Sequence, residues 1–166
     1  MFSAAERMLS PVTGFSEMAA IANLKSGLKP PQSGIHLHSW SDGLAMRVAP
    51  IGIVGSGNYE LTTRLTIADG QVSHAGEGIH SGVAVAVAIA AAMNGESAID
   101  CFSAAKRSIP EDCWSSRAIF KVEEILHQNM NDEIHVLTDK LVAAVATHEY
   151  HYADLDRKST RLNSSH

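Results

Sequence analysis

The chain is poor in the residue types that mark several large classes of protein. Aromatic residues make up 5% of its 166 residues, so small aliphatic side chains must dominate the core. Its two cysteines, Cys101 and Cys113, form neither a disulfide framework nor a Cys-x-x-Cys motif, which predicts a cytoplasmic protein with reduced thiols. The net charge is −5 and there is no basic stripe before Arg157, so we expect no nucleic-acid partner.

Long hydrophobic runs are also missing. The longest, residues 83–93, is well short of the about 20 residues that a membrane-spanning helix needs. Residues 1–14 lack the basic start and apolar centre of a signal peptide. No membrane partner is therefore expected. The glycines of residues 55–58 do not have the Gly-x-Gly-x-x-Gly spacing and follow no strand, which argues against a dinucleotide-binding fold.

Most of the sequence has the apolar periodicity and the punctuation of helices. Pro50 is expected to kink or restart the helix that contains it, because proline has no N–H to donate. Residues 35–40 are expected to form a loop, and Leu61, Leu65 and Ala68 a shared face of the following helix. Helices are predicted over residues 15–28, 42–54, 59–71, 78–94, 98–107, 113–129 and 133–150. The predicted fold class is all-α, a multi-helix globular bundle.

Two stretches combine compact polar residues and glycine with the start of a helix: residues 41–52, SDGLAMRVAPIG, and residues 73–78, SHAGEG. Glycine lets a backbone come close to a ligand. The N-terminus of a helix offers N–H groups and a positive dipole end, which suit a phosphate. A helix cap followed by a packed helix explains either stretch equally well.

Each polar residue in these stretches has a binding and a structural interpretation. Asp42 either contacts a hydroxyl group of a polyol ligand, caps its own helix, or does both. Arg47 lies among small apolar residues, where an unpaired charge is costly, so it needs a partner. That partner is a ligand phosphate or an internal carboxylate such as Asp69 or Glu77. His74 is either a ligand contact or a helix-terminal residue, and Glu77 either caps a helix or orients the site.

Taken in order, these motifs resemble those of the ADP-ribosylglycohydrolase family. The family pattern is a small-residue turn, Ala-Met-Arg, a proline–glycine pair, and Ser/Thr-His before an alanine-rich helix. The matching residues here are Asp42-Gly43, Ala45-Met46-Arg47, Pro50 with Gly52, Ser73-His74 and residues 83–93. Many members have Asn where this chain has Asp42. Weaker similarity at residues 109–114 and 150–155 extends the resemblance over roughly residues 30–155.

The resemblance implies a hydrolase that cleaves a glycosidic bond to ADP-ribose or a related ribosyl compound. Its partner would be an ADP-ribosyl small molecule or an ADP-ribosylated protein, and its cofactor two magnesium ions. The substrate-binding residues that it implies are Asp42, Gly43, Met46, Arg47, His74 and Glu77. The alternative is a catalytically inactive helical protein that keeps the family's shell for binding or structure.

The family's two magnesium-binding motifs do not occur in the sequence. One is Thr-Asp-Asp near the N-terminus and the other Asp-x-Asp-Thr/Ser near the C-terminus, but Asp154-Leu155-Asp156 is followed by Arg157. We therefore expect residues 1–156 to be an incomplete piece of the family's helical domain, inactive by itself and without catalytic residues. Residues 157–166, RKSTRLNSSH, are typical of translated adapter sequence or of a disordered tail.

Overall fold

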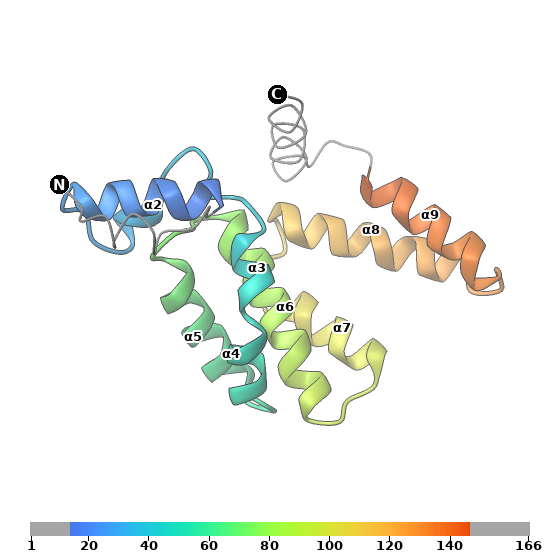
Figure 1. The fold of residues 1–166 in the computed structure, drawn as a ribbon. Coiled ribbons are helices and arrows are strands. Elements are labelled where there is room, and N and C mark those ends of the chain that lie inside the picture. Colours follow the sequence, from blue (N-terminus) through green and yellow to red (C-terminus); the bar gives the residue numbers. More distant parts are fainter. Residues whose placement is uncertain (1–13, 147–166) are drawn as a thin grey trace.

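The computed structural model describes residues 14–146, which form helices joined by turns (Figure 1). The helices are α2 (Phe15–Lys25), η1 (Gln32–Gly34), α3 (Gly43–Arg47), α4 (Ala49–Val54), α5 (Tyr59–Gly70), α6 (Glu77–Met93), α7 (Ala98–Arg107), α8 (Trp114–Gln128) and α9 (Ile134–Ala146). No strand occurs among these residues, which confirms the all-α class. Within the same residues, no helix is long and apolar enough to span a membrane. The Asp154-Leu155-Asp156 motif and residues 157–166 lie outside the described residues.

Helix α6 is the centre of the fold. Helices α3, α4, α5 and α7 pack against it, and α8 and α9 extend from its N-terminal end as a hairpin (Figure 1). Glycine, alanine and valine make up the buried positions of α6, so its neighbours come very close. A Cβ added to Gly52 of α4 would lie 2.7 Å from the Ala86 carbonyl oxygen, and one added to Gly82 would lie 2.6 Å from Leu44 Cδ2. The alanine-rich run in the sequence is therefore the surface on which the other helices assemble.

The segment around Pro50 forms two short helices. Helix α3 ends at Arg47, and α4 restarts at Ala49 with Pro50 in its first turn. Proline is tolerated there because the N–H groups of the first turn have no partner within the helix. This confirms the predicted restart. Of Ser41 and Asp42, the two residues that could cap this helix, Asp42 occupies the N-cap position, but its side chain makes no capping hydrogen bond. The Ser41 hydroxyl bonds to Ser16 and His74 instead.

Helix α5 buries a different face from the one we predicted. Leu65 is 39% exposed, whereas Thr62 and Thr66 are fully buried and Gly70 is buried with them. The reason is steric, because a Cβ added to Gly70 would lie 2.6 Å from Leu44 Cδ2. At this distance from α3 and α6 only small side chains fit. The Thr62 hydroxyl remains satisfied, because it donates to the carbonyl oxygens of Asn58, the N-cap residue of α5, and of Gly55 in the preceding turn.

Candidate functional site

The two sequence motifs meet in a closed ring of hydrogen bonds between α2, α3 and the turns before α3 and α6. Arg47 donates to the Ser73 hydroxyl at 2.8 Å, and Ser73 bonds to Nδ1 of His74 at 2.8 Å. His74 bonds to the hydroxyl of Ser41, which bonds to that of Ser16. The Ser16 hydroxyl bonds to the Glu17 carboxylate, and the ion pair between Glu17 and Arg47 closes the ring. Its six members are Ser16, Glu17, Ser41, Arg47, Ser73 and His74.

The ring fixes the tautomer of His74. The Ser16 hydroxyl donates to the Glu17 carboxylate, so it accepts from Ser41. Ser41 has then used its one proton and must accept from Nε2 of His74, 3.2 Å away. Nδ1 is left as the acceptor for the Ser73 hydroxyl. His74 is therefore neutral, with its proton on Nε2.

Burial keeps His74 neutral at physiological pH. Its side chain is 1% exposed, and this burial, together with the positive charge of Arg47, lowers its pKa to about 4. Two glycines make room for the imidazole of His74. A Cβ added to Gly43 would lie 3.1 Å from Nε2, and one added to Gly78 would lie 3.0 Å from Cδ2. His74 thus lies below the surface, where it connects the loops that carry the two motifs.

Arg47 has internal carboxylate partners. Its Nε donates to Asp69 at 2.9 Å and one terminal nitrogen donates to Glu17 at 3.0 Å, while the other serves Ser73. The sequence indicated Asp69 or Glu77 as a possible carboxylate partner of Arg47. In the structure the partners are Asp69 and a residue that was not considered, Glu17. The Arg47 side chain remains 34% exposed. Its guanidinium therefore forms part of the surface as well as part of the ring.

Glu77 lies apart from this ring. Its carboxylate accepts hydrogen bonds from the amides of Trp114 and Ser115 and from the Ser115 hydroxyl, each at 2.9 Å. Burial opposes its ionisation, but these bonds hold the pKa of Glu77 below its ordinary value. Glu77 therefore caps α8. Of the other residues that the resemblance marked, Gly43 contacts His74, whereas Asp42 is exposed and Met46 is 75% exposed.

The sequence did not single out two of the ring's members, Ser16 and Glu17. Ser16 and Glu17 lie in α2, far from both motifs along the chain, and no local pattern connects them to Arg47. A half-buried guanidinium needs more than one acceptor. The position of Arg47 among apolar residues could therefore have predicted a second carboxylate partner, which the structure shows to be Glu17.

The described residues do not fit a pair of magnesium ions. Magnesium takes a nearly octahedral shell of oxygen atoms. Glu17 and Asp69 are the carboxylates beside the ring, and the Arg47 guanidinium already lies between them. The one group of three close metal-ligating side chains within residues 14–146 is Glu77, His80 and Cys113, which offers oxygen, nitrogen and sulfur. Nitrogen and sulfur donors favour zinc-like ions over magnesium.

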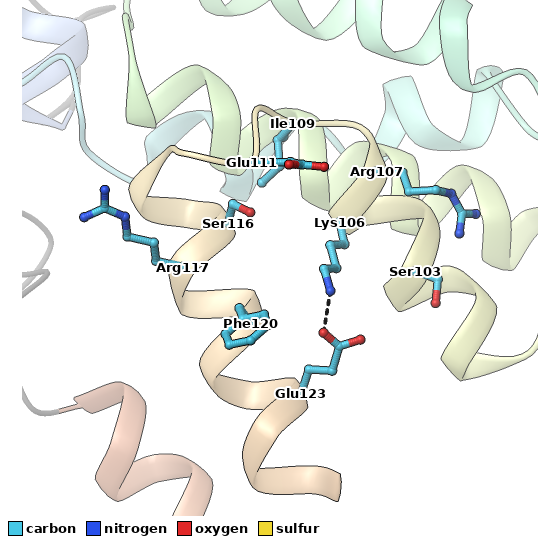
Figure 2. A pocket seen from close by; sticks show the side chains of 9 residues that line it. All are labelled: Ser103, Lys106, Arg107, Ile109, Glu111, Ser116, Arg117, Phe120 and Glu123. Atoms are coloured by element: carbon cyan, nitrogen blue, oxygen red, sulfur yellow. Dashed lines mark hydrogen bonds and ion pairs between the residues drawn. The ribbon is translucent and has the colours of Figure 1, made fainter.

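An open cavity of about 850 Å³ lies between α7 and α8 (Figure 2). Lys106 and Glu123 form an ion pair within it, and the aromatic ring of Phe120 lies beside them. Arg107 and Arg117 add positive charge to its wall. No residue from either sequence motif lines this cavity, so it is separate from the ring around His74.

Comparison with known proteins gives one match. Searches of curated proteins and of solved structures found no significant match. The family model described as ADP-ribosylglycohydrolase matches residues 4–156, which include both motifs and all members of the hydrogen-bonded ring. The chain belongs to the ADP-ribosylglycohydrolase family and therefore resembles hydrolases.

Proposed function

We propose that this chain contributes part of the substrate cleft of a hydrolase that cleaves a glycosidic bond to ADP-ribose or a related ribosyl compound. The observation that carries the proposal is the partly exposed guanidinium of Arg47, held by carboxylates on two sides and next to Asp42 and Gly43. The hydrogen-bonded ring below it fixes these groups in place, so a ligand would meet a preorganised polar surface.

The balance of charge favours the ribose over the diphosphate as the part of the ligand bound here. Glu17 and Asp69 carry two negative charges against the single positive charge of Arg47. Asp42 adds a further carboxylate at the start of α3. Carboxylates accept hydrogen bonds from ribose hydroxyls but repel phosphate groups. Arg47 uses two of its nitrogens in the ring and the third for Asp69, and it keeps N–H groups that can reach a ribose oxygen.

Binding without hydrolysis is the second candidate. It is favoured by the pairing of Arg47 with both Glu17 and Asp69, because a carboxylate held in an ion pair is a poor general base and a poor metal ligand. The acidic motifs that the family uses to hold magnesium do not occur in this sequence. A protein of this kind would recognise an ADP-ribosyl group and leave its glycosidic bond intact.

Replacing Asp42 tests the binding surface without disturbing the fold, because its side chain is exposed and makes no capping bond. In titration calorimetry, Asp42→Ala should weaken the binding of ADP-ribose by about 10- to 100-fold, as expected for the loss of a charge-assisted hydrogen bond of about 1.5–3 kcal/mol. Glu60→Ala, at another exposed carboxylate, is the matched control. Because the carboxylates favour ribose over phosphate, ribose should compete for the site more effectively than inorganic pyrophosphate. Equal affinities in wild type and Asp42→Ala would refute the proposed surface.

An assay of hydrolysis separates the two candidates. The full chain is incubated with an ADP-ribosylated arginine or serine peptide in millimolar magnesium, and release of ADP-ribose is followed by chromatography. Binding without turnover supports a protein that only recognises the ligand. Turnover that EDTA abolishes would assign metal-dependent hydrolysis to this chain and would refute a protein that only recognises the ligand.

A further inference from the structure

Three different metal-ligating atoms meet where the N-terminal turn of α6 approaches the start of α8. Glu77 and His80 lie three residues apart on α6 and therefore share one face of the helix. Cys113 is the residue that caps α8. A carboxylate oxygen, a ring nitrogen and the Cys113 sulfur all lie within 4.8 Å of one another. None of these atoms belongs to the ring around His74.

His80 supplies an independent observation that points to a cation at this place. Its Nδ1 is buried and has no hydrogen-bond partner among the described residues. The carboxylate oxygen Oε1 of Glu77 lies 3.6 Å away, beyond hydrogen-bonding distance. A buried nitrogen next to an oxygen at this separation is the arrangement that a cation between the two atoms would satisfy.

The surroundings of the cluster already orient two of its donors. The amides of Trp114 and Ser115 hold the Glu77 carboxylate, yet Oε1 accepts only one of these bonds and keeps a free lone pair. The amide of Ser116 donates to the sulfur of Cys113 at 3.3 Å. Amide bonds of this kind fix the orientation of metal ligands.

The donor set selects the kind of metal. Thiolate, imidazole and carboxylate together are typical of zinc, and the two negative charges of Cys113 and Glu77 would balance a divalent ion. Tetrahedral zinc separates such donor atoms by roughly 3.3–3.6 Å. His80 and Glu77 already have this spacing at 3.6 Å, and a change of about 1 Å in side-chain position would bring Cys113 into range.

We propose that Glu77, His80 and Cys113 bind one zinc-like divalent ion, with water in the fourth position, and that the ion links α6 to α8. The role of this ion is distinct from that of the magnesium ions that the family resemblance implies. It would connect the hairpin of α8 and α9 to the central helix at the point where Glu77 already caps α8.

Cobalt provides the most direct test, because a thiolate bound to Co²⁺ gives a charge-transfer band that histidine and carboxylate ligands do not. The purified full chain is titrated with Co²⁺ and then with Zn²⁺, and the metal content is measured after dialysis. Cys113→Ser removes the thiolate and keeps a good helix cap, so the fold is preserved. Cys101→Ser, at the other cysteine of the chain, is the matched control.

The proposal expects one zinc ion per chain and a thiolate-to-cobalt band in wild type and in Cys101→Ser. Cys113→Ser should lose the band, and Cys113→Ser and His80→Gln should each weaken zinc binding by on the order of 100-fold or more. Zinc should also raise the Tm of wild type but not of Cys113→Ser. Absence of the band in wild type, its persistence in Cys113→Ser, or equal zinc affinity in the wild type and both ligand variants would each overturn the proposal.

Discussion

Removing the imidazole of His74 should destabilise the whole fold, because this side chain joins the turn before α3 to the turn before α6 from inside the protein. His74 is 1% exposed, and its two nitrogens bond to the hydroxyls of Ser41 and Ser73. His74→Ala loses two hydrogen bonds of about 1 kcal/mol each and leaves a cavity beside Gly43 and Gly78. The free energy of unfolding should therefore fall by about 2–4 kcal/mol.

Urea unfolding at pH 7, followed by circular dichroism, measures this loss. His127→Ala is the control, because His127 is exposed near the end of α8 and its removal should change the free energy by no more than about 0.5 kcal/mol. If His74→Ala costs no more than His127→Ala, the ring of hydrogen bonds does not hold the loops together. The structural interpretation of His74 would then be wrong.

Three further predictions concern stability. Burial and Arg47 lower the pKa of His74 from 6.5 to about 4, so as the pH falls through this range the unfolded chain binds a proton that the folded protein does not. The free energy of unfolding should be constant above about pH 6.5 and fall by up to roughly 3 kcal/mol toward pH 4. Most of this slope should vanish in His74→Ala. The remainder belongs to His36, whose pKa burial also lowers, and near pH 4 to Glu77, whose pKa its hydrogen bonds lower. Gly34→Ala places a Cβ 2.5 Å from the carbonyl oxygen of His74 and should cost about 1–3 kcal/mol or more in thermal unfolding, and a Tm equal to that of wild type would contradict the close packing. Glu77→Gln weakens the cap of α8 and should lower stability by about 0.5–2 kcal/mol and slightly reduce the helical signal, whereas unchanged values would refute the capping role.

The helices could be predicted from the sequence because their signals are local. The α7 bounds agree with the predicted residues 98–107, and α6 and α8 begin and end within one residue of the prediction. Gly95 and Pro110 mark the ends of the helices before them, and both act through backbone geometry alone. The face of α5 could not be predicted in this way. Its buried threonines are determined by how closely α3 and α6 approach, which is a property of the packed fold.

In the candidate site, too, the local sequence predicted which residues need partners but not the distant residues that serve as those partners. The sequence required a partner for Arg47, and Asp69 was among those considered, but Glu17 is 30 residues away along the chain. Likewise, nothing near His74 in sequence indicates that it bonds to Ser41, 33 residues earlier. A motif reveals which residues need partners, and only the fold decides which partners they receive.

The structure also separates the residues of the two motifs by what each can reveal about function. Arg47, His74 and Gly43 are needed to build the site, so substitutions there change stability and binding together. Asp42 and Met46 are exposed, and the side chain of Asp42 makes no capping hydrogen bond. The stability of the fold therefore does not explain why these residue types occur at these two positions. A change in ligand affinity on replacing these two residues would therefore report binding alone. At Asp42 and Met46, the effect of a substitution on ligand affinity can be measured without a correction for an effect on stability.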